Sequence, residues 1–292
     1  MSNKTMYYSL RAGAIAAKVI PRNIGLTISY LFGYLYGFIP SKTTKKLVKI
    51  HKVISPNYDK KSLKRRARQV IGSYAQYWWD VFWLSTERSK KSINNIIGFE
   101  GKIYFDQAIE MANKSNVGLI LALPHVGSWE IAGAWLAANG FKPYAVAERL
   151  NPPELFELFT KTRNDSGIEI IAHDDHPTSK LITAINEGGL VCLVADRDIS
   201  RRGKSFPFFG KTKTFPLGPA SLSIKTDAVI LPVCMYLNHA KKIDITCYPP
   251  VIAKEYENSE TITGHIVKIF EEMISKDPSQ WHVLSYEWSD DE

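Results

Sequence analysis

The fold is decided by one segment near the middle of the chain, Val117-Gly-Leu-Ile-Leu-Ala-Leu-Pro-His125-Val-Gly-Ser-Trp-Glu130-Ile-Ala-Gly-Ala-Trp-Leu136. Its first seven residues are apolar or glycine, as in a strand that is buried on both faces. Pro124 ends the strand, His125 follows in a turn, and Glu130 lies in the first turn of a helix. A buried strand, a turn and a helix in this order indicate a parallel α/β unit.

The same alternation continues on both sides of this segment. Apolar runs at 117–123, 144–147, 169–172, 190–195, 229–235 and 243–247 predict strands, and helical stretches are expected near 103–114, 130–138, 153–164, 178–187, 217–226 and 259–276. We therefore predict an α/β fold with a mainly parallel, mixed central sheet and helices on both faces. Residues 1–292 are interpreted as one domain, with N-terminal helices over 1–100 and an α/β core over 101–292.

The N-terminal part combines apolar and basic segments. Residues 24–39 carry no charge, but three tyrosines and three glycines interrupt them, and Pro21 and Pro40 bracket them. A spanning helix needs about 20 apolar residues, so we favour helices that lie in or against a membrane interface over one that crosses it. Trp and Tyr in the helix expected over 60–84 fit either a core-facing stripe or such an interface.

The net charge of +8 points to an anionic partner, but its sign does not choose among nucleic acid, acidic lipid and a phosphorylated small molecule. Its distribution favours anionic lipid headgroups, because a dense run of cations directly follows the apolar segment. A solvated helix face is the alternative. The cations of this run are Lys42, Lys45, Lys46, Lys49, Lys52, Lys60, Lys61, Lys64, Arg65, Arg66 and Arg68.

Two classes of site receive little support. The chain has no glycine-rich phosphate loop, no dinucleotide fingerprint and no zinc spacing. Cys192, Cys234 and Cys247 are few and odd in number, as in a protein of a reducing compartment. We expect no metal, no resident cofactor and no nucleic acid partner.

His125 and Glu130 are the predicted catalytic residues. A turn between strand and helix can return the Glu130 carboxylate to the imidazole, fixing its tautomer and leaving the other nitrogen free to take a proton from an alcohol. Amides near Gly127 and Ser128, at the start of the helix, are candidate oxyanion donors. A structural histidine that caps the turn is the alternative, although a polar residue directly beyond a buried strand favours function.

A second polar cluster follows the strand at 190–195. Asp196, Arg197, Asp198 and Arg201 are candidates for binding a sugar or a phosphate, because the guanidinium fork matches phosphate oxygens; an internally paired surface loop is the alternative. The aromatic and proline-rich segments 206–210 and 215–219 are a candidate wall of an acyl groove, or ordinary packing. Glu148, Arg149 and Arg163 are expected on the same edge of the sheet, although exposed helix charges would look alike.

With these residues placed, the sequence resembles the bacterial lysophospholipid acyltransferase superfamily in its lipid A acyltransferase branch. It is most similar to the actinobacterial members that acylate phosphatidylinositol mannosides. The resemblance spans nearly the whole chain, and the order and spacing of its motifs are specific. They are His125 to Glu130, Ala195 to Gly203 leading to Phe208-Phe-Gly210, Leu217-Gly-Pro-Ala220 and Pro278-Ser-Gln-Trp-His282.

The resemblance implies a monotopic or peripheral enzyme on the cytoplasmic face of the membrane. It would move a long-chain, palmitoyl-like acyl group from acyl-CoA to a mannose hydroxyl of a phosphatidylinositol mannoside. His125 would be the base and Glu130 its partner, where related members often carry Asp. Glu148 and Arg163 match charged positions of the acceptor and catalytic region, and Asp196, Arg197 and Asp198 match a second site motif.

Three alternatives remain open from the residues. A lipid A-type secondary acyltransferase would share the chemistry, but that branch commonly starts with a clearer spanning helix than the interrupted segment here. The Pro-Glu-Gly-Thr block of glycerophospholipid acyltransferases is replaced by Ala195-Asp-Arg-Asp198, which argues against a lysophosphatidate substrate and favours a glycolipid acceptor. A non-catalytic protein could bind anionic membranes through residues 42–68. A metal-dependent hydrolase built on His125, His173, Asp196 and Asp198 would need a metal that the spacing supports poorly.

Overall fold

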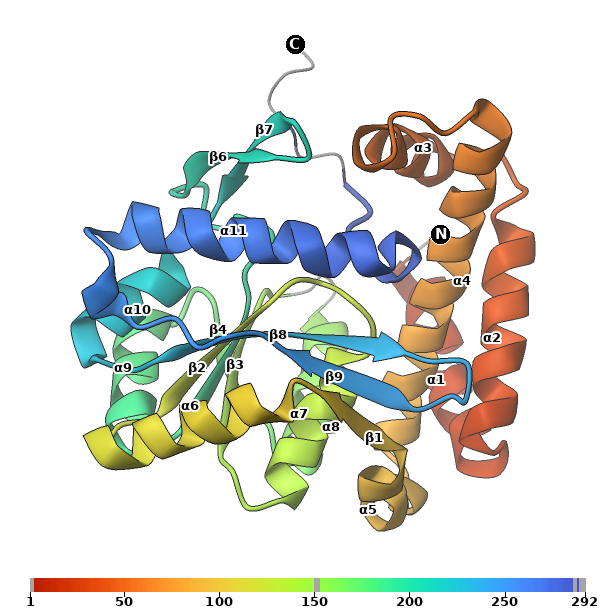
Figure 1. Ribbon diagram of the computed structural model, residues 1–292. Coiled ribbons are helices and arrows are strands. Elements are labelled where there is room, and N and C mark those ends of the chain that lie inside the picture. The colour runs from red at the N-terminus through yellow and green to blue at the C-terminus, as the bar shows by residue number, and fades with distance from the viewer. Residues whose placement is uncertain (1–2, 150–152, 286–287, 289–292) are drawn as a thin grey trace.

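The chain folds around a seven-stranded sheet with helices on both faces (Figure 1). The computed structural model describes residues 3–149, 153–285 and 288. The strand order is β1-β9-β8-β2-β5-β3-β4, and every pairing is parallel except that of β8 with β9. The strands are β1 (Ile97–Glu100), β2 (Leu119–Leu123), β3 (Pro143–Ala147), β4 (Glu169–Ala172), β5 (Leu190–Val194), β8 (Ile230–Leu237) and β9 (Ile243–Cys247). The predicted α/β fold with a mainly parallel sheet is confirmed.

Two hydrophobic cores lie on the two faces of this sheet, and β2 supplies both. Leu119, Leu121 and Leu123 join one core, whereas Ile120 and Ala122 join the other, because successive side chains of a strand point to opposite faces. α6 (Lys102–Ser115) and α7 (Trp129–Ala138) cover the first face, and α9 (Pro177–Asn186), α10 (Gly218–Thr226) and α11 (Ser259–Lys276) cover the second. β2 is consequently buried along its whole length.

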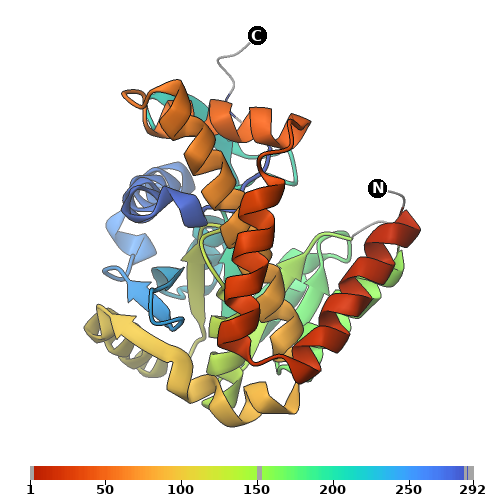
Figure 2. The ribbon, with the colours of Figure 1, turned by 90° about the vertical axis from the view of Figure 1, so that its right-hand side faces the viewer.

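The N-terminal quarter is a group of helices beside the sheet, where Figure 2 shows α1 and α2 next to the long α4. α2 packs along α4 at a close crossing of two glycines. A Cβ on Gly33 would lie 2.6 Å from the Ile71 carbonyl oxygen, and one on Gly72 would lie 2.8 Å from the Tyr30 ring, so both positions require a residue without a side chain. The helices are α1 (Asn3–Val19), α2 (Arg22–Tyr36), α3 (Lys42–Ile54), α4 (Lys60–Leu84) and the short α5 (Glu87–Ser92).

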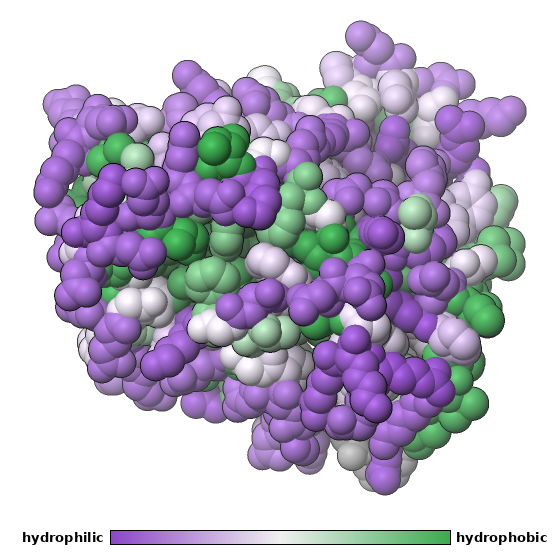
Figure 3. All heavy atoms as spheres, turned by 60° about the horizontal axis from the view of Figure 1, so that its bottom comes forward, coloured by the Kyte–Doolittle hydropathy of each residue, from purple (hydrophilic) through white to green (hydrophobic). Residues whose placement is uncertain are grey.

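The outer face of α2 exposes large apolar side chains to solvent. Hydrophobic side chains gather along the right-hand margin of Figure 3, the side on which α1 and α2 lie in Figure 1. Among the described residues, no helix combines the length and the apolar character that crossing a bilayer requires. The exposed side chains of α2 and of the segment after it are Ile24, Ile28, Leu31, Phe32, Leu35, Tyr36, Phe38 and Ile39.

The predicted aromatic wall over 206–210 is core packing and does not line an acyl groove. Residues 204–215 form an antiparallel hairpin of β6 (Lys204–Phe208) and β7 (Lys211–Phe215), which the sequence did not reveal. Phe208 and Phe215 are fully buried, and Phe208 packs against Trp281 and Trp288. The aromatic rings of this segment therefore anchor the hairpin to the C-terminal segment.

Two buried histidines make the fold sensitive to acid. His51 of α3 has no hydrogen-bond partner for either ring nitrogen, and burial, followed by the charge of Arg66, lowers its pKa from 6.5 to about 3. Burial, followed by the charge of His125, lowers the pKa of His282 to about 3 as well. The unfolded chain takes up these protons near pH 6.5, so the folded state loses stability as the pH falls from about 6.5 toward 3.

We expect the free energy of unfolding to fall less steeply with pH below pH 6 in His51→Leu than in the wild type. Each buried histidine contributes up to about 1.4 kcal/mol per pH unit to that slope. Urea unfolding followed by circular dichroism at pH 7.5, 6 and 5 measures the slope. The exposed His239 offers the control His239→Gln, which should keep the wild-type slope. Equal slopes for His51→Leu and wild type would contradict the expectation.

Candidate active site

His125 stands in a turn directly beyond β2, and neighbouring chain segments hold this turn in place. The His125 carbonyl accepts a hydrogen bond from the His282 amide (2.8 Å), and the Gly127 amide donates to the Gln280 carbonyl (3.0 Å). Gly127 has φ +63°, and a Cβ there would lie 1.9 Å from the Met235 carbonyl oxygen, so only glycine fits. Because its amide is already bonded, Gly127 is not the oxyanion donor that the sequence suggested.

The carboxylate that orients His125 belongs to Asp196. His125 Nδ1 is hydrogen-bonded to Asp196 Oδ1, while the His125 amide (2.9 Å) and Trp281 Nε1 (2.7 Å) donate to Oδ2. β5 lies beside β2 in parallel register, with Leu123 opposite Val194, so the residues that follow the two strands meet at one edge. The arrangement leaves the second ring nitrogen, Nε2, to face a substrate.

The electrostatics of this pair keep Asp196 ionised. The carboxylate is fully buried, and burial alone would raise its pKa. The charge of His125 and the hydrogen bonds from His125 and Trp281 outweigh burial and lower the pKa of Asp196 to about 2. A buried anion on Nδ1 stabilises the positive charge that the ring acquires when Nε2 takes a proton.

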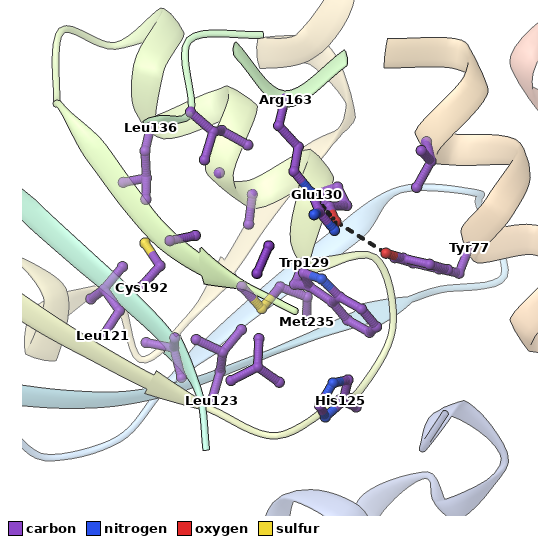
Figure 4. Close-up of a pocket in the computed structure, with 18 of the residues that line it drawn as sticks. Tyr77, Leu121, Leu123, His125, Trp129, Glu130, Leu136, Arg163, Cys192 and Met235 are labelled. Atoms are coloured by element: carbon purple, nitrogen blue, oxygen red, sulfur yellow. Dashed lines mark hydrogen bonds and ion pairs between the residues drawn. The ribbon is translucent and has the colours of Figure 1, made fainter. Parts of the chain in front are cut away.

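Glu130 does not contact His125, which corrects the predicted catalytic pair. Its carboxylate accepts hydrogen bonds from Tyr77 Oη (3.0 Å) and from Arg163 Nε (2.9 Å) and Nη2 (2.5 Å), as Figure 4 shows. The Trp129 ring packs edge-on against His125, with the ring centroids 5.3 Å apart. Since α7 begins with Trp129 beside the imidazole, the next residue faces α4 and α8 (Pro153–Asp165).

The ion pair of Glu130 and Arg163 belongs to the same site. Burial would lower the pKa of Arg163, but the charge and hydrogen bonds of Glu130 raise it above its usual value. Burial, followed by the charge of Glu130, raises the pKa of Tyr77 well above 10, so its phenol stays neutral and donates. Arg163 is thus held by Glu130, whereas the sequence had assigned it to substrate binding.

An apolar cavity of about 320 Å³ opens beside His125, between the sheet and helices α4, α7 and α8. Leu121, Leu123, Cys192 and Met235 line it from the strands (Figure 4). Burial raises the pKa of the Cys192 thiol to about 12, so this side chain is neutral and apolar at physiological pH. An aromatic group on β1, α6 and α7 lines another part of the cavity: Phe99, Phe105 and Trp135. Such a cavity suits a hydrocarbon chain.

A second, polar hollow adjoins this cavity and collects the other predicted residues. Glu148, Arg197 and Ile199 line both spaces, so the two are contiguous, and Asp198 and Arg201 line the polar one. The structure therefore brings Glu148, Arg197, Asp198 and Arg201 together, as the strand ends predicted.

Several predicted residues nevertheless have different contacts from those expected. Asp198 accepts hydrogen bonds from the Gly203 amide and the Ser200 hydroxyl, both at 2.7 Å, and so also shapes its own loop. Asp196 is buried under His125 and is not a substrate ligand. Ser128 donates its hydroxyl to Asp80 Oδ2 (2.6 Å) and is 2 % exposed, so its side chain is not presented to a substrate. Arg149 pairs with Asp174 at 2.8 Å on the surface.

Sequence reasoning missed four residues that support the site. Tyr77 holds Glu130, Trp281 holds Asp196, and the buried Lys213 donates to the Asp196 carbonyl oxygen (2.6 Å). His282 lines the cavity, and its Nε2 is hydrogen-bonded to the Ser73 hydroxyl (2.9 Å). Trp281 and His282 lie in a motif that carried the family resemblance, which was the available signal. No group of three or more His, Cys, Asp or Glu side chains that could hold a metal ion occurs in the described part of the chain.

Comparison with known proteins identifies the family. Residues 4–290 match the profile of bacterial lipid A biosynthesis acyltransferases. The chain belongs to this family. A phosphatidylinositol mannoside acyltransferase of Mycobacterium tuberculosis is 32 % identical over 225 residues, which is 75 % of this chain and 68 % of the relative. The enzyme of the same name from Mycolicibacterium smegmatis is 31 % identical over 226 residues, 76 % of this chain and 71 % of the relative.

One solved structure is also similar. A 1-acyl-sn-glycerophosphate acyltransferase from Thermotoga maritima aligns at 12 % identity and a TM-score of 0.41, over 86 % of this chain and 97 % of that one.

Family membership makes this protein an enzyme that transfers acyl groups, so the non-catalytic alternative is wrong.

For this acyltransferase we expect Asp196→Asn to lower kcat by two or more orders of magnitude, since an amide favours the wrong tautomer of the histidine it contacts. Glu130→Gln should cost less, because it weakens the Arg163 pair and leaves His125 with its carboxylate. Acyl transfer from labelled donor measures both. Asp244→Asn, which alters a carboxylate on β9 bonded to Asn238, is the control and should keep wild-type kcat. A larger loss for Glu130→Gln than for Asp196→Asn would contradict this assignment.

Proposed function

We propose that this acyltransferase moves a long-chain acyl group from acyl-CoA to a mannose hydroxyl of a phosphatidylinositol mannoside, with His125 as general base. The observation that carries the proposal is the position of His125, which is backed by a buried carboxylate and lines an apolar cavity that adjoins a polar hollow. An acyl chain and a sugar alcohol can meet there on either side of one base.

The reaction follows from this placement. With the acyl chain in the cavity, the thioester carbonyl lies beside His125. Nε2 of His125 takes the proton of the sugar hydroxyl, while the oxygen of that hydroxyl forms the new ester bond to the carbonyl carbon. The carbon–sulfur bond then breaks, and the proton passes from the imidazolium to the departing thiolate of coenzyme A. Asp196 remains ionised throughout and stabilises the imidazolium.

The polar hollow supplies the contacts for the acceptor. Arg197 and Arg201 lie at its wall, and guanidinium groups bind phosphate oxygens through paired hydrogen bonds. Glu148 and Asp198 offer carboxylates that accept hydrogen bonds from sugar hydroxyls. The acceptor itself is taken from the names of the relatives, which are phosphatidylinositol mannoside acyltransferases.

The surface of α2 to α4 suits attachment to the cytoplasmic face of the membrane, which we include in the proposal. The apolar side chains on the outer face of α2 range from 51 % to 73 % exposed between Ile24 and Tyr36. α3 and the start of α4 place a basic surface next to the end of α2, because Arg68 lies over the Phe38 ring, 4.1 Å from its centroid. Apolar insertion together with cations near anionic headgroups is the pattern of an interfacial protein.

The function is tested by incubating the purified protein with palmitoyl-CoA and three acceptors: a phosphatidylinositol mannoside, a lipid A precursor and lysophosphatidate. We expect acylation of the mannoside, with the modified hydroxyl identified by mass spectrometry, and slow hydrolysis of acyl-CoA when no acceptor is present. Faster acylation of the lipid A precursor would instead support a lipid A-type secondary acyltransferase. His125→Ala should abolish transfer and hydrolysis together, because both use the same base.

Membrane attachment is tested by co-sedimentation with vesicles that contain anionic phospholipid. Replacing Phe32 and Leu35 together by serine should lower the partition coefficient about a hundredfold or more, since each apolar side chain that enters the interface contributes about 1.5–3 kcal/mol. The same exchange at the exposed Ile103 and Ile224, on α6 and α10, is the matched control and should have no effect. Equal binding of both double variants would argue against α2 as the attachment surface.

A further inference from the structure

A buried ion pair joins α2 to α4 close to the active site. Arg22 Nε lies 2.7 Å from Asp80 Oδ1, and Arg22 Nη2 lies 3.0 Å from Oδ2. Arg22 is 6 % exposed and Asp80 is fully buried. Since removing two charges from water costs much of what their attraction gains, stability alone is a weak reason for such a pair.

Asp80 has a second partner, Ser128, which lies in the catalytic turn. The Ser128 hydroxyl donates to Asp80 Oδ2 at 2.6 Å, and Ser128 immediately precedes the first residue of α7. That first residue is Trp129, whose ring packs edge-on against His125. Hydrogen bonds therefore connect Arg22 of α2, through Asp80, to Ser128. Ser128 directly precedes Trp129, whose ring contacts His125.

The other restraints on the turn act at a different place. Asp196 and the segment 280–282 hold His125 and Gly127 through backbone bonds. The side chain of Ser128 is held by Asp80 alone among the described residues. Arg22 in turn is fixed on its far side, because its Nη1 donates to the Lys241 carbonyl oxygen in the turn between β8 and β9. The side chains at both ends of this series of hydrogen bonds, Arg22 and Ser128, are therefore held in place.

We propose that Asp80, oriented by Arg22, is a positioning residue of this acyltransferase. It holds Ser128, and through it the start of α7 and the Trp129 ring against His125. The same bonds tie the catalytic turn to α2, the helix whose outer face is apolar. The kinetic part of this inference rests on the proposed function, whereas the structural part does not.

The kinetic test uses Ser128→Ala in the full-length protein, because this change leaves the Arg22–Asp80 pair intact. We expect kcat for acyl transfer to fall about tenfold to a hundredfold, with the KM for acyl-CoA unchanged, since misplacing a catalytic group slows the chemical step. Ser223→Ala is the matched control: Ser223 is fully buried, donates to the Ala228 carbonyl (2.6 Å), and lies on α10 away from the site. Equal kcat values for Ser128→Ala and Ser223→Ala would overturn the proposal.

The link to α2 is tested with 5-fluorotryptophan, which reports the surroundings of Trp129 by fluorine NMR. The chain has seven tryptophans, and the resonance of Trp129 is assigned as the one that disappears in Trp129→Phe. We expect Arg22→Met to shift or broaden the Trp129 resonance and to lower kcat. Arg22→Lys is the second variant, with the same expected effects, if Arg22→Met does not fold. Ser223→Ala should leave it at the wild-type position.

Three outcomes test the inference and the proposed function separately. An unchanged Trp129 resonance in both Arg22 variants would overturn the link to α2. If the wild-type protein acylated none of the offered acceptors, the proposed function would fail, while the fluorine spectra would still decide the inference. The double variant Arg22→Lys with Ser128→Ala gives a third test. If its loss of kcat equals the product of the two single losses, the two residues act independently, and this result would also overturn the inference.

Discussion

The site depends on one buried carboxylate. Asp196 is removed from water and accepts hydrogen bonds from the His125 ring, the His125 amide and the Trp281 indole. An uncompensated anion at this depth would be very costly, so its three donors must all be present when the protein is folded. Two of these donors belong to His125, beyond the end of β2, and the third to Trp281 in the C-terminal segment, whereas Asp196 itself follows the neighbouring β5. The need to satisfy one charge thus brings three distant parts of the chain to the edge of the sheet.

Most of the fold was predictable, because each buried strand is an apolar run between helices. The strands at 169–172 and 243–247 have the predicted bounds, and the others shift by one or two residues. β1 is only four residues long and contains Gly98, and β6 contains Pro207. Neither strand therefore has the apolar run from which a strand is predicted. They are strands because of their partners: β9 for β1, and the other arm of the hairpin for β6.

The site was predicted in composition but not in its connections. His125, Glu130, Arg163, Asp196 and Arg197 all lie in or around it, yet the sequence does not state the order of strands in the sheet. β2 and β5 are neighbours although two strands and three helices separate them in the chain, and only that adjacency places Asp196 beside His125. The direction of Glu130 was equally hidden, because it depends on how Trp129 seats the first turn of α7. Local spacing suggested a partner within five residues, and tertiary structure supplied one 71 residues away.

The hydrogen bonds between residues 280–282 and the turn at His125 have a consequence for the order of folding. The amide of His282 and the carbonyl of Gln280 secure that turn, and Trp281 completes the shell around Asp196. The strand before the turn and the helix after it therefore cannot fix it by themselves. The turn is completed only when a segment far along the chain, beyond α11, docks against it. Contacts between residues so far apart in sequence form slowly because of the entropy of closing the intervening loop, so we expect the reactive centre to be among the last parts of the fold to assemble.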